Sequence, residues 1–225
     1  MQINGFYINL NKRTDRNEHF EKTVKSRSFF SNVKRMNAIE YSNGAVGCGL
    51  SHLKCLFELG NLSEGDKYIV GNMHDKFVII MEDDFVILNE IHFQYFCSSF
   101  EKIQNSDEWD IIVLTPRGDT LIEENKNDMN TNDFKRIINN QTTTGYIIKT
   151  EFIPYLYKNI KDAIEQLIRT NNLSLYSIDQ YWKILQRKHK FYYYNHIFAG
   201  QLPGWSDLEK KYVNYNERYI KQLYY

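Results

Sequence analysis

Apolar residues along the chain form short continuous runs, which alternate with longer segments where they recur every three or four positions. A bounded apolar run is typical of a strand buried on both faces, and the longer spacing is typical of an amphipathic helix. Their alternation predicts an α/β fold with a mostly parallel sheet flanked by helices. The predicted strands are Ile3–Leu10, Asn32–Ala38, Phe77–Val86 and Trp109–Leu114, and helical spacing covers Phe20–Val24, Leu50–Phe57 and Ile91–Phe100.

Strands that follow one another in the sequence are usually neighbours in a sheet. We therefore expect Trp109–Leu114 to lie beside Phe77–Val86. Two polar stretches, 60–76 and 118–135, are predicted as loops. The other predicted elements are a strand pair (Phe134–Asn139 with Thr144–Lys149), a helix beginning within Phe152–Tyr157, a β-prone run at Phe191–Phe198 and a C-terminal helix at Leu208–Tyr225.

Composition narrows the class of protein. The 225 residues contain no linker rich in proline, glycine or serine, so we expect one domain. Because 28 basic residues balance 28 acidic ones, a broad nucleic-acid-binding surface is not expected. Three cysteines are too few for a disulfide framework and are predicted to be free thiols. No apolar stretch approaches the roughly 20 residues of a membrane span. No signal peptide is visible, so we expect a cytoplasmic protein, or one of the host cytoplasm if its source is a virus.

Three carboxylates, Glu82, Asp83 and Asp84, follow the apolar residues of Phe77–Met81. Ligands of open α/β sheets bind outside the carboxyl ends of the strands, where such acids can hold a divalent cation and, through it, a phosphate. Side chains alternate along a strand, so Glu82 and Asp84 are expected on one side and Asp83 on the other. The alternative is that the acids cap and begin the next helix.

Two upstream stretches also carry candidate chemistry. Arg13 and Arg16 lie at a predicted helix start after the first strand, an arrangement that suits a diphosphate. The alternative is a solvated helix start in which Asp15 pairs locally. Further on, three glycines within 44–49 allow close backbone approach and precede Ser51 and His52. The alternative is a tight helix–strand contact in which His52 is a satisfied, half-buried histidine.

Taken together and in this order, these stretches resemble glycosyltransferase family 25, which includes bacterial lipooligosaccharide and collagen galactosyltransferases. The resemblance rests on Ile8–Leu10 with Arg13, Asp15 and Arg16, on Gly47–His52, and on Met81–Asp84, and it continues weakly to Ser206–Leu208. It implies a GT-A-like, Rossmann-type domain, a uridine diphosphate sugar as donor and inversion at the anomeric carbon. Residues 1–115 would then bind the nucleotide sugar, and residues 116–225 would face the acceptor.

The resemblance also implies roles for single residues. Donor contacts are expected from Asn9, Leu10, Arg13, Arg16, Ser51, His52, Glu82, Asp83 and Gly145. Manganese or another divalent cation would be held by Asp84, Asp83 and His196, and the alternative for His196 is a strand residue that binds no metal. Asp179, near the start of a helix, would be the catalytic base, with dipole complementarity as the alternative.

The function implied is transfer of galactose or glucose to a hydroxyl of a glycan, a lipid-linked glycan or a glycoprotein, with no nucleic-acid partner and no transmembrane segment. Two alternatives stay open: an inactive transferase-like binding module, and a metal-dependent phosphoester hydrolase.

Overall fold

The computed structural model describes residues 1–60, 75–117, 132–206 and 211–215. Among these, seven strands form the central sheet in the order β2-β1-β3-β7-β5-β8-β6. Their bounds are β1 Gly5–Asn9, β2 Val33–Asn37, β3 Phe77–Glu82, β5 Ile111–Val113, β6 Phe134–Arg136, β7 Gly145–Lys149 and β8 Phe191–Tyr194. The pairs β1–β2, β1–β3 and β5–β8 are parallel, whereas β7 is antiparallel to β3 and β5, and β6 is antiparallel to β8. All but β6 and β7 therefore run in one direction.

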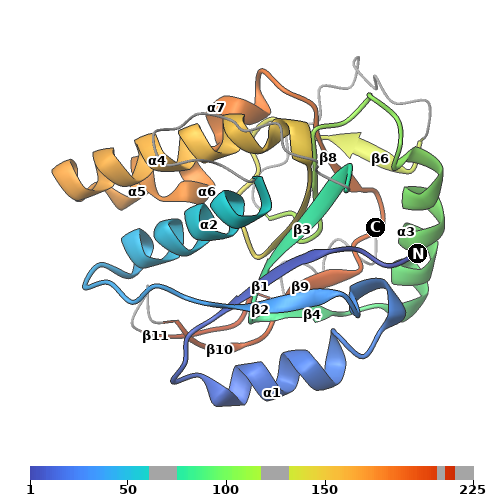
Figure 1. Cartoon of the computed structure of the whole chain (residues 1–225), viewed down its shortest axis with the longest axis horizontal. Coiled ribbons are helices and arrows are strands. Elements are labelled where there is room, and N and C mark those ends of the chain that lie inside the picture. The colour runs from blue at the N-terminus through green and yellow to red at the C-terminus, as the bar shows by residue number, and fades with distance from the viewer. Residues whose placement is uncertain (61–74, 118–131, 207–210, 216–225) are drawn as a thin grey trace.

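Helices cover both faces of this sheet (Figure 1). One face carries α2 and α4, and the other carries α1 and α3. The longer helices are α1 Thr14–Thr23, α2 Gly44–Gly60, α3 Glu90–Ile103 and α4 Ile153–Thr170. The shorter ones are η1 Ser28–Phe30, η2 Thr150–Phe152, α5 Leu173–Tyr176, α6 Ile178–Tyr181 and α7 Lys183–Gln186. The predicted α/β class, with a mostly parallel sheet flanked by helices, is confirmed.

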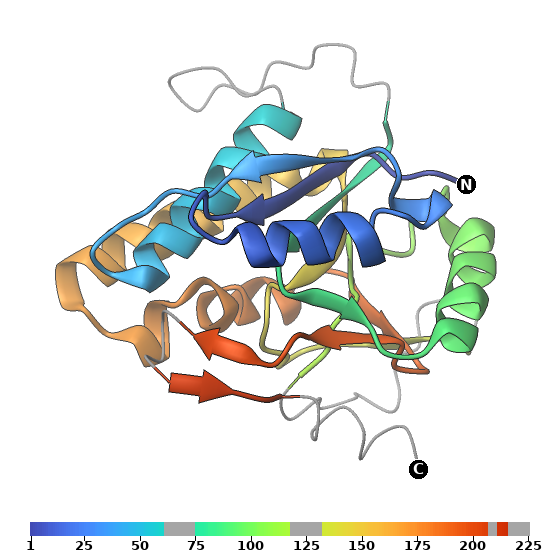
Figure 2. The same ribbon diagram turned by 90° about the horizontal axis from the view of Figure 1, so that it is seen from below.

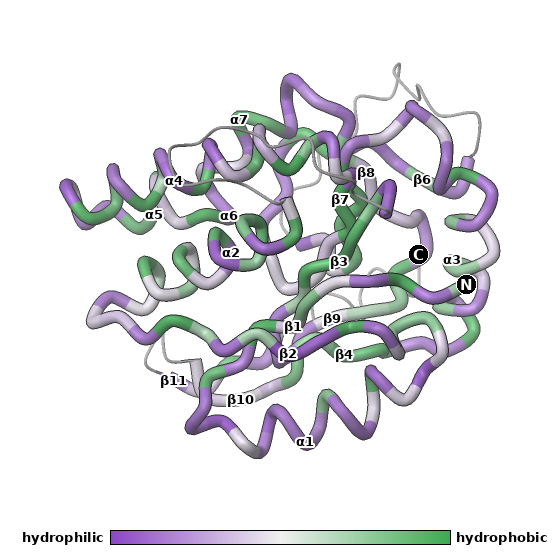
Figure 3. The backbone as a smooth tube through the Cα atoms, in the orientation of Figure 1, coloured by the Kyte–Doolittle hydropathy of each residue, from purple (hydrophilic) through white to green (hydrophobic). Residues whose placement is uncertain are grey.

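The strand β3 shows how the sequence pattern produces these layers. Ile79 and Met81 pack into the core beneath α1 and α3, whereas Val78 and Ile80 pack into the core beneath α2 and α4. Because successive side chains point to opposite faces, only a continuous apolar run can fill both cores. In Figure 3 the hydrophobic colour is concentrated along β3 and β7 at the centre, while most of α1 is hydrophilic.

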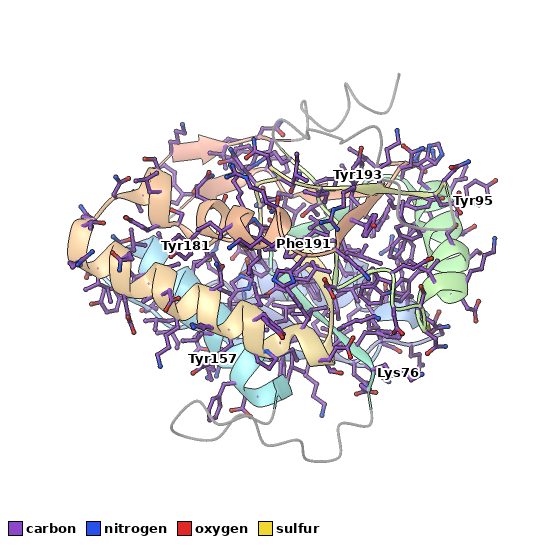
Figure 4. The ribbon with its side chains drawn as sticks, turned by 90° about the horizontal axis from the view of Figure 1, so that it is seen from above. Lys76, Tyr95, Tyr157, Tyr181, Phe191 and Tyr193 are labelled. Atoms are coloured by element: carbon purple, nitrogen blue, oxygen red, sulfur yellow. The ribbon has the colours of Figure 1, made fainter. Side chains whose placement is uncertain are left out.

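The core beneath α1 and α3 is largely aromatic. Phe96 of α3 stacks on Phe198 at 4.6 Å between ring centroids, and Tyr7 of β1 stacks on Phe20 of α1 at 4.1 Å. On the opposite face α4 packs along α2 (Figure 4). That view places Phe191 of β8 near the centre of the molecule and Tyr95 of α3 at its edge.

Two small sheets complete the described fold. One joins β4 Phe85–Ile87 to β9 Ala199–Gln201, and the other joins β10 Gly204–Ser206 to β11 Lys211–Val213. Figure 2 shows β10 and β11 side by side. The strand β11 corrects the prediction of a continuous C-terminal helix, since residues 211–213 are extended. Residues 207–210 and 216–225 of that prediction lie outside the described residues.

The predicted pairing of the later strands is wrong. Trp109–Leu114 does not lie beside Phe77–Val86, because β7 comes between β3 and β5. Nor does Phe134–Asn139 pair with Thr144–Lys149, because β6 pairs with β8 instead. Burial explains the order: every residue of β7 is buried, as a central strand requires, whereas β6 has one buried residue of three and forms an edge. Most of the two predicted loops, at 61–74 and 118–131, lies outside the described residues.

Candidate functional site

A cavity of about 660 Å³ opens where the carboxyl ends of β1 and β3 meet the start of α2, the helix α6 and the hairpin β10–β11. Pockets of roughly 300–1,000 Å³ are the usual size for small-molecule sites. Of the residues singled out from the sequence, those that line the cavity are Leu10, Arg13, Arg16, Ser51, His52, Glu82, Asp83, Asp84 and Asp179. They come from segments up to 169 positions apart, Leu10 to Asp179, so the fold gathers most of the predicted site into one place.

The centre of the site is an ion cluster of Arg16 with Asp83 and Asp84. The Arg16 Nη1 lies 3.0 Å from Asp83 Oδ1 and 3.4 Å from Asp84 Oδ2. Its Nη2 donates to the backbone carbonyl of Trp205, 3.1 Å away, which ties α1 to the β10–β11 hairpin. All three charged side chains are at most 17% exposed, so the pairing is poorly screened by solvent.

The expected alternation of the three acids holds only to the end of the strand. Since β3 ends at Glu82, Asp83 and Asp84 lie in a turn, and Arg16 reaches both of them. The alternative that the acids begin the next helix is also wrong, because β4 follows directly and α3 begins only at Glu90, capped by Asn89.

Asn9 holds Asp83 in place although it does not line the cavity. Its amide donates to Asp83 Oδ2 at 2.7 Å and to the Arg13 carbonyl at 3.0 Å, and its oxygen accepts from Arg35 at 2.9 Å. Burial raises the pKa of Asp83, and Arg16 and Asn9 only partly offset that effect. Asn9 therefore acts as a positioning residue that joins the end of β1 to the acidic turn.

Glu82 points toward α2. Its Oε1 accepts from the Thr143 hydroxyl at 2.9 Å and lies 3.4 Å from His52 Nε2. Burial favours the neutral acid, but His52, Thr143 and Arg16 outweigh burial and hold the pKa of Glu82 below its usual value. The carboxylate is therefore ionised in a largely enclosed position.

Asp84 is the least satisfied of the three acids. Burial, together with the neighbouring charge of Glu82, raises its pKa from 3.8 to about 7, although Arg16 acts in the opposite direction. Its Oδ1 is buried and has no hydrogen-bond partner among the described residues. A buried oxygen without a donor is costly, so Asp84 fits an oxygen ligand for a divalent cation. Asp83 fits this role less well, because Asn9 and Arg16 already bond both of its oxygens.

Asp179 lies in the first turn of α6 and also lines the cavity. Burial raises its pKa, while Arg117 and the backbone of Thr142 partly offset that rise. Ser177 occupies the N-cap position of this helix, but its side chain makes no capping hydrogen bond. A half-buried carboxylate with a raised pKa is suited to accepting a proton.

Three predicted residues differ from expectation in their surroundings. His196 does not line the cavity; its ring lies 5.3 Å from that of His92 on α3, so we do not propose it as a ligand beside the acids. Gly145 is also outside the lining, and a Cβ there would lie 2.8 Å from the Phe85 ring, so its role is close packing. Arg13 lines the cavity while pairing with Asp15 at 3.0 Å, the local pairing considered above.

The sequence reading missed several lining residues. Arg117 contributes a further, half-buried guanidinium, which donates to Gln201 Oε1 at 3.1 Å and stacks over the Tyr215 ring at 4.0 Å. Thr142 has a φ of 87°, a conformation that a β-branched residue adopts only at a cost, and such strain is concentrated at functional sites. The sequence feature that could have identified this part of the cavity wall is the run of three threonines at 142–144, because it directly precedes a predicted strand.

No protein-family model matches the chain, and a comparison with curated proteins gives no match. Among solved structures, the chain is similar to apo-UDP-glucose pyrophosphorylase, with a TM-score of 0.44 and 12% identity over 97% of this chain and 78% of that one. A similarity at this level says nothing about what the chain binds or which reaction it catalyses. Within the described ranges no helix has the length and apolar character needed to cross a bilayer.

Proposed function

We propose that the chain is an inverting glycosyltransferase, related to glycosyltransferase family 25, which moves galactose or glucose from a uridine diphosphate sugar to a hydroxyl of a glycan, lipid-linked glycan or glycoprotein. The observation that carries this proposal is the acidic turn, where the buried Oδ1 of Asp84 has no partner among the described residues and borders a cavity lined by three arginines and Asp179. The strained backbone of Thr142 in the cavity wall adds support, because such strained residues are concentrated at active sites and ligand-binding positions.

In this proposal the diphosphate lies beside the acidic turn. Arg13 and Lys12 on the cavity wall supply positive charge, and Arg16 can donate from the same side. A divalent cation held by Asp84 would supply Lewis-acid stabilisation of the leaving diphosphate. Asn9 and Arg16 fix Asp83, which keeps the turn in place while the donor binds.

Asp179 is the proposed base for the acceptor hydroxyl. The acceptor oxygen would attack the anomeric carbon from the face opposite the diphosphate, and the hydroxyl proton would pass to Asp179 as the new bond forms. Burial raises the pKa of Asp179 above its usual value, which makes the carboxylate a better proton acceptor. In the proposed division, residues 1–115 bind the donor and residues 116–225, which include Asp179, face the acceptor.

A second candidate is a nucleotide-sugar-binding module without turnover. The contact of Arg16 with both Asp83 and Asp84 favours it, because a guanidinium in that position already neutralises part of the carboxylate charge that would attract a metal. The two candidates predict the same donor binding and differ in whether an acceptor releases free nucleotide.

Thermal unfolding with uridine diphosphate and Mn²⁺ tests the donor site. A ligand at a hundred times its Kd stabilises the native state by about 2.7 kcal/mol, or about 5–11 °C in Tm for a domain of this size. We expect the shift to disappear in Asp84→Ala and to persist in Asp107→Ala, a matched variant at a fully exposed carboxylate outside the cavity. No shift with any nucleotide or nucleotide sugar would contradict the proposal. If the nucleotide raises the Tm but no acceptor causes release of uridine diphosphate, the chain is the binding module described above and not a transferase.

A further inference from the structure

A cluster of three metal-binding side chains lies in the wall of the cavity next to the acidic turn. Cys48 and His52 are four residues apart on α2, which places them on one face of that helix, and Glu82 approaches them from the end of β3. Their ligand atoms all lie within 4.8 Å of one another. Thiolate, imidazole and carboxylate are the three ligand types that Zn²⁺ accepts.

The histidine provides an independent sign that something is bound there. His52 is fully buried, and its Nε2 has no hydrogen-bond partner among the described residues although it is directed at Glu82. The separation of Nε2 and Oε1 is 3.4 Å, longer than a good N–H···O hydrogen bond of about 2.7–3.2 Å. Two ligands about 2.1 Å from one tetrahedral ion lie about 3.4 Å apart. The observed spacing therefore fits a shared ion better than a direct hydrogen bond.

Two of the three ligand side chains have polar contacts of the kind found around bound metals. The other ring nitrogen, His52 Nδ1, lies 3.1 Å from the Tyr146 hydroxyl, so a proton on Nδ1 leaves the lone pair of Nε2 for a cation. The Thr143 hydroxyl donates to Glu82 and fixes its carboxylate. Ligating histidines and carboxylates are usually held by such outer hydrogen bonds.

Charge at this end of the cavity also favours a cation. Glu82, Asp83, Asp84 and Asp179 line the same space, and Arg16 is the guanidinium that pairs with two of them. Although Lys12, Arg13 and Arg117 also line the cavity, the charged groups that act on the Cys48 thiol are the carboxylates of Glu82, Asp179 and Asp84. An added charge of +2 beside that thiol would offset part of their negative charge. The three ligands all line the cavity, so the fourth position of a tetrahedral ion can be filled by water or by a bound ligand.

We propose that Cys48, His52 and Glu82 form a binding site for a zinc-like divalent cation, separate from the oxygen ligand offered by Asp84. On binding, the Cys48 thiol releases its proton to solvent as the Sγ–metal bond forms, so occupancy rises with pH. The ligand atoms, which lie within 4.8 Å of one another, would approach to the roughly 3.4–3.8 Å that separates two ligands of a tetrahedral ion. The site goes beyond the proposed transfer reaction, and it can be measured without any nucleotide.

Titration of the metal-free protein with Co²⁺ tests the site, because cobalt reports thiolate ligation by a charge-transfer band in the near ultraviolet. We expect one equivalent to develop the band together with tetrahedral visible absorption, and Zn²⁺ to displace both. The band should vanish in Cys48→Ser and persist in Cys55→Ser, the matched variant on the same helix outside the cluster. Tyr146→Phe should weaken binding about 10–100-fold. Absence of the band, or an unchanged band in Cys48→Ser, would overturn the proposal.

Thiol protection gives a second test that needs no variant. Zn²⁺ should slow alkylation of Cys48 severalfold and leave Cys97 unchanged, since both thiols are half-buried and only Cys48 belongs to the cluster. Peptide mass spectrometry resolves the two rates, and equal rates with and without Zn²⁺ would refute the site. Neither test depends on donor binding, so failure here leaves the nucleotide-sugar proposal untouched.

Discussion

Replacing Arg16 with Gln removes the positive partner of two buried carboxylates. The side chains of Arg16, Asp83 and Asp84 are 17%, 10% and 14% exposed, so water does little to compensate for the loss. Breaking a buried pair by removing one partner costs about 3–5 kcal/mol. Single domains are stable by about 5–15 kcal/mol, so the variant should fold but unfold at a Tm lower by at least about 6 °C.

The effect of pH on this variant follows from the sign of the pKa shifts. Burial raises the pKa of Asp84 to about 7 and also raises that of Asp83, and removing Arg16 raises both further. When the pKa of a carboxyl group is higher in the folded state than in the unfolded state, the free energy of unfolding of the protein falls as pH rises through the folded-state pKa. The deficit of Arg16→Gln relative to the native protein should therefore be larger at pH 8 than at pH 5.

Urea denaturation at the two pH values, with chelator present, measures this deficit. Arg13→Gln is the matched control, because Arg13 lies at the same helix start but pairs with Asp15, whose side chain is 67% exposed. Exposed pairs contribute about 0–1 kcal/mol. Equal losses for the two variants, or a deficit for Arg16→Gln that grows toward pH 5, would refute the reasoning.

Three further changes test other contacts. Asp179→Asn should lower the transfer rate by about 10²–10⁴-fold while leaving the nucleotide-induced Tm shift intact, and an unchanged rate would remove Asp179 as the base. Gly5→Ala should prevent stable folding, because its Cβ would lie 1.9 Å from the Ile79 carbonyl oxygen, and a native circular dichroism spectrum would contradict this. Tyr7→Phe should cost about 1–2 kcal/mol in urea denaturation, since the buried Tyr7 hydroxyl lies 2.7 Å from Glu21 and within bonding distance of Asn17.

The sequence predicted where the charged residues of the candidate site lie along the fold, but it did not predict which side chains contact one another. It placed Glu82, Asp83 and Asp84 at the carboxyl end of a buried strand, because apolar periodicity and the place where it stops are local properties. It did not show that Arg16 would reach two of these acids, or that His52 would approach the third. Those contacts depend on how separate elements pack, and no local spacing encodes them.

The sequence by itself determined the α/β class and the strands on which the site is built. Its continuous apolar run at Phe77–Met81 required helices on both faces, since alternate side chains must be buried on opposite sides. Only the tertiary structure decided that β7 lies between β3 and β5, that His196 lies beside His92, and that Cys48 joins His52 and Glu82. The physical reason is that backbone periodicity fixes which face a side chain occupies, whereas long-range packing decides what that face meets.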